Sequence, residues 1–131
     1  MSTTNESASA VTDRDHVAGV QLSTITDEFM RERLATAKPY TLMLLKKTPE
    51  YRQPDADPIV WEHGRRNMAL EQHGALAIVL PVGGDELAGI GIFDATPKEV
   101  TEIMNADPGI QAGIFTCELH PARGFPSSAL P

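Results

Sequence analysis

Between residues 40 and 119 the chain alternates four short apolar runs with two segments of helical periodicity, an order that few small folds can accommodate. Each run has the length of a strand and is bounded by turn residues such as Gly, Pro or Asp. In the third run, Gly89 and Gly91 share one face, which leaves room there for a closely packed helix or a ligand. We expect strands at 40–47 (YTLMLLKK), 76–82 (LAIVLPV), 86–94 (ELAGIGIFD) and 113–119 (GIFTCEL).

The two helical segments carry start and stop signals. Residues 57–73 begin with Asp-Pro, a capping carboxylate followed by proline in the first turn, and Gly74 suits the left-handed position after a helix. Residues 96–107 begin with TPKE, in which the threonine caps, the proline takes the first helical position and the glutamate completes a capping box. This second helix is expected to end at an Asp-Pro pair.

The element order is therefore β-α-β-β-α-β, which predicts an α+β fold of the ferredoxin-like plait type. Two helices would cover one face of a four-stranded antiparallel sheet. The open face would carry apolar residues from all four strands, and an exposed apolar area of that size usually marks an interface. We therefore expect a homodimer in which two sheets stack through their open faces.

The ends of the chain differ from this central part. Residues 1–22 are rich in Ser, Thr, Asp and Ala and are expected to form a flexible arm. Residues 23–38 carry apolar side chains at helical spacing and are expected to form a helical extension that Thr26 caps. The main domain would then be 39–131, and its last part, 120–131 (HPARGFPSSALP), is expected to be irregular because it contains three prolines.

Composition and charge exclude several classes of protein. The chain has 131 residues, with 18 Asp and Glu against 11 Lys and Arg, so its net charge of -7 argues against nucleic acid as the main partner. Its single cysteine, Cys117, cannot form an internal disulfide, which favours a reducing compartment. No apolar run approaches the roughly 20 residues of a membrane helix, and no secretory signal is evident. We expect a soluble cytoplasmic protein without a membrane partner.

Two polar residues fall on the inward face of the first helix. A projection at about 100° per residue places His63 and Asn67 on the apolar stripe, whereas Arg66 falls outside it. Buried polar groups need hydrogen-bond partners. His63 can therefore be read as a satisfied core histidine or as a functional residue.

Asp107 continues the apolar stripe of the second helix. A carboxylate at a helix C-terminus costs about 0.3–1 kcal/mol, because it faces the negative end of the helix dipole. Asp107 could simply begin an Asp-Pro turn. Alternatively, it could accept a hydrogen bond from His63 across the gap between the helices and fix the tautomer of the ring. Spacing leaves both interpretations open.

Other candidate groups are weaker. Cys117 has no basic neighbour in sequence, so an inert buried thiol is favoured over a nucleophile. His63 and His73 fall on different helix faces, and no carboxylate completes a metal-ligand set. The glycines of GGDELAGIG open a strand and precede no helix with a lysine, which argues against a phosphate loop. No cofactor and no metal is therefore expected.

Five segments between residues 40 and 123 can be compared with known families: YTLMLLKK, WEHGRRNMALEQHGAL, AGIGIFDA, TPKEVTEIMNADP and GIFTCELHP. Taken together, these segments resemble the YCII-related (YciI-like) family. The resemblance implies a ferredoxin-like dimeric α/β barrel and a His-Asp dyad, which falls on His63 and Asp107. One branch of that family is a dehydrochlorinase of chlorinated hydroxyhydroquinones, and the wider superfamily includes muconolactone isomerases and cofactor-free monooxygenases. The chain departs from short members in its N-terminal arm and its proline-rich tail.

Two functional hypotheses follow. In the first, the protein is a cofactor-independent enzyme in which His63 exchanges protons with a small, cyclic or phenolic organic molecule and Asp107 orients the ring. Asn67 and Arg66 are then candidates for holding a substrate oxygen or carboxylate, and the reaction would be an elimination or isomerisation. In the second, the protein is a small-molecule-binding or dimerisation module with a structural His-Asp pair.

Overall fold

The computed structural model describes residues 19–131, and the chain divides into two compact units, Met1–Ala35 and Thr36–Pro131. Most of the predicted arm, residues 1–18, lies outside the described residues. The described part of the first unit holds the 3-10 helix η1 (Leu22–Thr24) and the helix α2 (Asp27–Ala35). Thr26 caps α2 as predicted, since its Oγ1 accepts a hydrogen bond from the backbone N–H of Phe29 at 3.0 Å.

The helical extension predicted for residues 23–38 is shorter in the structure. The helix α2 ends at Ala35, and Lys38 already begins the first strand. A proline disfavours the helical conformation of the residue before it, so Pro39 holds Lys38 in extended backbone. None of the residues of α2 is buried.

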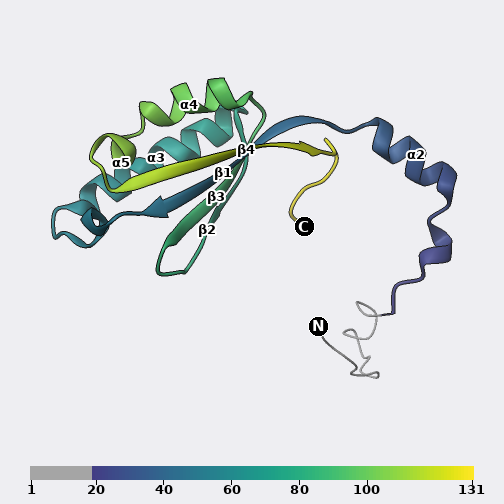
Figure 1. The fold of residues 1–131 in the computed structure, drawn as a ribbon, viewed down its shortest axis with the longest axis horizontal. Helices are drawn as coiled ribbons and strands as arrows, with labels where there is room; N and C mark the ends of the chain where they lie inside the picture. Colours follow the sequence, from purple (N-terminus) through teal and green to yellow (C-terminus); the bar gives the residue numbers. More distant parts are fainter. Residues whose placement is uncertain (1–18) are drawn as a thin grey trace. The chain divides into compact units, whose positions relative to one another are not determined.

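The second unit contains a four-stranded antiparallel sheet with the strand order β2-β3-β1-β4 (Figure 1). Its strands are β1 (Lys38–Lys47), β2 (Leu76–Pro81), β3 (Leu87–Phe93) and β4 (Phe115–Gly124). Its helices are η2 (Pro49–Arg52), α3 (Ala56–His73), α4 (Pro97–Asn105) and α5 (Pro108–Gln111). The fold is α+β, and its element order is compatible with the predicted ferredoxin-like plait.

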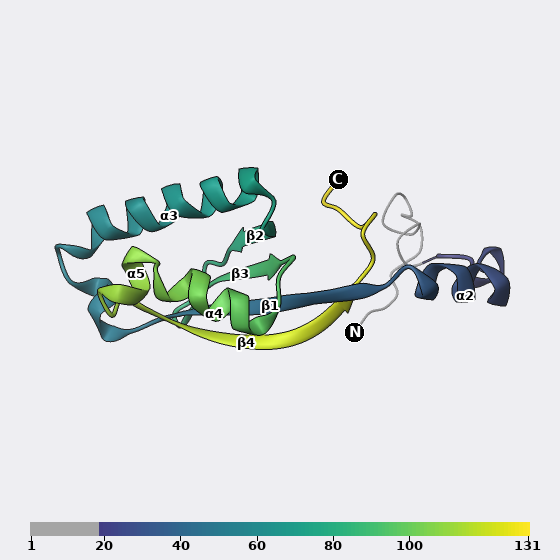
Figure 2. The same cartoon turned by 90° about the horizontal axis from the view of Figure 1, so that it is seen from above.

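One face of the sheet carries the core, and α3 and α4 cover it (Figure 2). Alternate residues of β1, namely Thr41, Met43 and Leu45, are buried there. Gly91 of β3 faces the same side, and a Cβ atom at that position would lie 3.1 Å from Met43 Cε. The glycine face of β3 therefore packs against the core, as its small side chains allow.

Most helix ends follow the predicted signals. Thr96 and Glu99 form the capping box of α4, with Thr96 N donating to Glu99 Oε1 at 2.8 Å. Gly74 ends α3 in the left-handed conformation, with φ of 96°. The start of α3 differs, because the helix begins at Ala56 and its N-cap is Asp55, so the prediction of Asp57 as the cap is wrong. Asp57 lies in the first turn instead, and Ala56 is buried against the core.

The strand β4 is longer than predicted and includes part of the expected irregular tail. It pairs with the whole of β1, from Lys47 opposite Phe115 to Lys38 opposite Gly124. Pro121 lacks a backbone N–H, but β4 is an edge strand, where such a residue is tolerated. The ten-residue partner strand therefore decides the length of β4.

The open face of the sheet is apolar on only part of its area. Leu44 of β1 pairs with Ile90 of β3 on one side and with Glu118 of β4 on the other. Glu118 Oε1 accepts a hydrogen bond from Lys46 Nζ at 2.7 Å, and His120 Nε2 lies 2.6 Å from Glu118 Oε2. The prediction of apolar residues from all four strands is therefore wrong for β4, whose alternation places Thr, Glu and His on this face. Between residues 19 and 131, no helix has the length and apolar character needed to cross a bilayer.

Candidate functional site

His63 of α3 and Asp107 form a buried hydrogen-bonded pair. The Nδ1 atom of His63 lies 2.9 Å from Asp107 Oδ1 and 2.8 Å from Asp107 Oδ2. His63 is 6% exposed, and Asp107 is fully buried. The two residues are separated by 44 positions in sequence, so the packing of α3 beside α5 brings them together.

Asp107 occupies a different place in its helix from the one predicted. The helix α4 ends at Asn105, and Asp107 is the N-cap of the short helix α5. Its Oδ2 atom accepts hydrogen bonds from the backbone N–H groups of Gly109 and Ile110 at 2.9 and 3.2 Å. The predicted unfavourable dipole interaction therefore does not arise, because the carboxylate lies at the favourable end of a helix. Asp107 thus both begins the turn and contacts His63.

The short helix α5 packs tightly against β4. A Cβ atom at Gly109 would lie 2.6 Å from Phe115 Cδ2 and 3.1 Å from Asp107 Oδ2. Only glycine fits this position without a shift of the neighbouring groups. Phe115 in turn packs against the ring of His63, with 4.8 Å between the ring centroids. The aromatic contact and the capped carboxylate hold the imidazole from two sides.

The hydrogen bonds define which nitrogen of His63 carries the proton in the neutral ring. An ionised carboxylate only accepts, so Nδ1 donates to Asp107. The other ring nitrogen, Nε2, is then an acceptor, and the Nδ2 atom of Asn67 lies 3.2 Å from it. The structure thus brings Asn67 to His63, one helical turn along α3. Because Nδ1 is turned to Asp107, the Nε2 edge is the part of the ring that can meet a ligand.

Arg66 lies on the Asp107 side of this arrangement. Its Nη1 atom is 3.7 Å from Asp107 Oδ1, beyond hydrogen-bond range. Among the described residues, this buried nitrogen has no hydrogen-bond partner. The positive charge of Arg66 therefore faces the carboxylate of Asp107.

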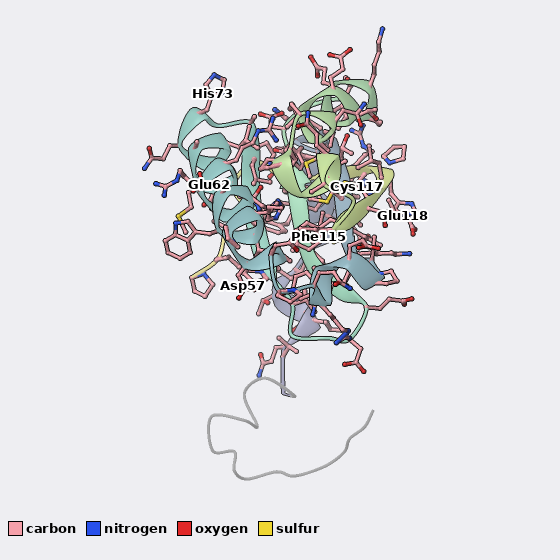
Figure 3. All side chains as sticks on the ribbon, turned by 90° about the vertical axis from the view of Figure 1, so that its left-hand side faces the viewer. Asp57, Glu62, His73, Phe115, Cys117 and Glu118 are labelled. Carbon is pink, nitrogen blue, oxygen red and sulfur yellow. The ribbon has the colours of Figure 1, made fainter. Side chains whose placement is uncertain are left out.

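A cavity of about 300 Å³ lies between α3 and the sheet, and His63 and Asn67 line it. Its walls are mainly apolar, and Arg66 and Asp107 are not among the lining residues. Lys47 supplies the charged side chain of the lining, and Tyr51 and Phe115 supply aromatic rings. Figure 3 shows Phe115 between α3 and the strands. The site therefore combines a histidine, an amide and an ammonium group in an apolar cavity.

Sequence reasoning missed several lining residues. Lys47 is the second of two adjacent lysines at a strand end, and nothing in the sequence shows which one faces the cavity. Gly64 lines the cavity from α3, and a Cβ atom there would meet no atom within 4 Å. A glycine inside a helix costs about 1 kcal/mol relative to alanine, so its position directly after His63 was a usable signal.

The remaining candidates lie away from this geometry. Burial, with a smaller contribution from the charge of Asp107, raises the pKa of the Cys117 thiol from 9.0 to about 11. This agrees with the interpretation of Cys117 as an inert thiol. His73 is exposed and points away from the domain (Figure 3). Within residues 19–131, no cluster of three or more His, Cys, Asp or Glu side chains is arranged to hold a metal ion.

Comparisons with known proteins do not identify the chain. No protein-family model matches it, and a search of curated proteins finds no match.

Proposed function

We propose that the protein is a cofactor-independent enzyme in which His63 acts as the acid/base group on a small cyclic or phenolic molecule. The observation that carries this proposal is the buried Nδ1–carboxylate hydrogen bond, which leaves Nε2 at the edge of an apolar cavity. A histidine held in this way accepts a proton through Nε2 while Asp107 stabilises the resulting imidazolium. The YCII-related family and its dimeric α/β barrel are part of the proposal, as is a cytoplasmic location.

The proposed reaction is a proton transfer followed by isomerisation or elimination. His63 Nε2 removes a proton from a carbon next to a carbonyl group, and the electron pair of the C–H bond moves onto the carbonyl oxygen. The imidazolium returns the proton to a different carbon, or a leaving group departs with its electron pair. For this step the Asn67 amide has to turn away from Nε2 and toward the substrate oxygen that gains charge, to which it donates, and Arg66 acts on the site through Asp107.

Solvent deuterium exchange tests this function without a known substrate. The protein is incubated in D2O with a panel of single-ring ketones, unsaturated lactones and substituted phenols, and deuterium at carbon is followed by NMR. We expect exchange with at least one compound in the wild type and none above background in His63→Gln. His73→Gln is the matched control, because His73 is exposed at the end of α3. Equal exchange in the wild type and His63→Gln would refute the role of His63.

One observation favours the alternative, a non-catalytic binding module. The Asn67 amide donates to Nε2, so both ring nitrogens have partners, as a structural histidine requires. In that case compounds that bind the cavity would show no exchange at carbon. His63→Gln would lower the stability of the fold while leaving that binding intact.

A further inference from the structure

We propose that the cavity beside His63 takes a small planar organic anion and that Lys47 binds its negatively charged group, which deepens the acid/base function proposed above. Lys47 is the last residue of β1, directly opposite Phe115 of β4 in the sheet register. A shift in the pairing of β1 with β3 occurs between Leu45 and Lys46. Lys46 contacts Glu118 on the open face, whereas Lys47 lines the cavity on the covered face.

The ammonium group of Lys47 is held in place but its charge is not neutralised. Its Nζ atom donates to the carbonyl oxygen of Gly84 at 2.8 Å and lies 4.8 Å from the ring centroid of Tyr51. In the described part of the chain, no carboxylate lies within 4.0 Å of this atom. Lys38 and Lys46, by contrast, pair with Asp94 and Glu118 at 2.9 and 2.7 Å. An ammonium has three donors, so two remain for a ligand.

The polarity of the cavity selects for a negative charge. Lys47, His63 and Asn67 line it, and no Asp or Glu side chain does. An anion therefore gains an interaction with Lys47 that a neutral analogue lacks, and the apolar walls strengthen this interaction because they lower the local dielectric constant. A cationic ligand would meet repulsion from the same group.

The aromatic lining and the volume of the cavity favour a single flat ring. Tyr51 and Phe115 contact each other with centroids 5.6 Å apart, and Phe115 continues to the ring of His63. Rings of this kind pack favourably against a planar ligand. A volume of about 300 Å³ is at the lower end for ligand cavities, which suits one ring and few substituents. The ligand class is therefore a single-ring carboxylate or phenolate.

Binding of benzoate and its neutral isostere benzamide tests the proposal, with titration followed by amide NMR on the full chain. We expect benzoate to bind the wild type at least about tenfold more tightly than benzamide. Lys47→Met should remove this preference, and Lys47→Arg should keep most of it. Lys46→Met is the matched control, because it removes the same charge one residue away on the open face, and it should change benzoate affinity less than about twofold.

The wild type supplies a second measurement that does not depend on how a variant folds. Raising the ionic strength should weaken benzoate binding and leave benzamide binding unchanged. Equal affinity of the wild type for benzoate and benzamide would overturn the proposal. Equal losses of benzoate affinity in Lys46→Met and Lys47→Met would do the same, and so would failure of both compounds to bind. Benzoate binding through Lys47 without any deuterium exchange in the panel would refute the acid/base function alone. Deuterium exchange in the panel, without tighter binding of benzoate than of benzamide, would refute the anion site alone.

Discussion

At the scale of single residues, the Asp107 carboxylate has little freedom to rotate. Its Oδ2 atom accepts from two backbone N–H groups and from His63, and its Oδ1 atom faces His63 and Arg66. The backbone donors come from α5, which close contact with Phe115 fixes in position. The orientation of the imidazole therefore depends on backbone geometry, which side-chain fluctuations disturb little.

Asp107→Asn is expected to invert the tautomer of His63. The backbone donors of Gly109 and Ile110 need the amide oxygen at the Oδ2 position, so the NH2 group occupies the Oδ1 position and faces Nδ1. We expect the ring to accept from this NH2 group at Nδ1 and to carry its proton on Nε2, although the amide oxygen at the Oδ2 position also lies within reach of Nδ1. We expect the 15N chemical shifts of Nδ1 and Nε2 to change places, and we expect the free energy of unfolding to fall by about 1–3 kcal/mol. Unchanged 15N shifts would contradict the inversion of the tautomer, and the exposed Asp85→Asn serves as the control.

The thiol of Cys117 is expected to react slowly near neutral pH. Because burial raises its pKa from 9.0 to about 11, the thiolate fraction at pH 8 is about a hundredfold lower than that of an exposed cysteine. The rate of labelling by a disulfide reagent should be lower than that of an exposed cysteine and should rise with pH until the pKa is passed. Labelling in urea is the control, because unfolding removes the burial. A folded-state rate equal to the unfolded rate at pH 8 would contradict this assignment.

At the scale of helices and strands, local signals and tertiary pairing contributed differently to what could be predicted. Caps are local, so Thr96 and Gly74 marked the ends of their helices correctly from sequence alone. The length of β4 depends on a partner strand far away in the chain, so its extension through Pro121 could not be predicted. The same holds for Lys47, because apolar residues occupy both faces of β1, so the alternation along the strand does not show from sequence which of the two adjacent lysines lies on the covered face.

In the candidate site, too, some residues could be predicted from local signals, whereas the position of others depends on tertiary packing. Helical periodicity was enough to place His63 and Asn67 on the inward face of α3, because both belong to one regular element. For Asp107 two local signals compete: the apolar stripe of α4 continues to it and predicts the end of that helix, whereas the Asp-Pro pair is also a start signal, and the structure follows the second as the N-cap of α5. The position of Arg66 beside the carboxylate follows only from the packing of α3 beside α5.

Gly64→Ala is expected to stabilise α3 and leave the cavity open. The new Cβ atom meets no atom within 4 Å, and alanine is favoured over glycine in a helix interior by about 1 kcal/mol. Urea unfolding should therefore show a higher midpoint than in the wild type. Gly74→Ala is the opposite control, because φ of 96° at that position strains any L-residue and should lower stability by about 1 kcal/mol. A destabilised Gly64→Ala would show that this side of α3 is filled.

A bulkier side chain at residue 64 tests whether the ligand binds in the cavity, because it should fill the cavity without changing the fold. Gly64→Leu extends into the space that Gly64 lines beside His63. We expect it to fold as the wild type does and to lose benzoate binding by about tenfold or more. Retained binding with a normal fold would place the ligand elsewhere on the molecule.

At the scale of the whole molecule, the buried core of residues 19–131 belongs to the unit Thr36–Pro131. The nine buried hydrophobic residues found in this described part come from the sheet, from the helices that cover one face of it, and from Ile114 just before β4. The other face has no covering element in that unit, and part of it is apolar. Leu42, Leu44, Ile90 and Ile92 lie on it at neighbouring positions of β1 and β3.

A second copy of the chain is the partner that we expect on this open face. Apolar residues on β1 and β3 lie beside a polar group formed by Lys46, Glu118 and His120. A twofold-related copy can therefore bury the apolar residues at the centre of the interface and leave the polar group at its rim. Leu44 pairs with Ile90 and Glu118 at the boundary between the two sets. A charge at this position would be buried without a partner in a dimer but solvated in a monomer.

Leu44→Glu is therefore expected to convert a dimer into a monomer, measured by light scattering at micromolar concentration. Trp61→Glu is the matched control, because Trp61 is 70% exposed on α3, away from the open face, and its replacement should leave the dimer intact. Dimerisation also makes the melting temperature rise with protein concentration in the wild type, and this dependence should disappear in Leu44→Glu. A wild type that is folded and monomeric at micromolar concentration would contradict the dimer, and the apolar part of the open face would then remain in contact with water.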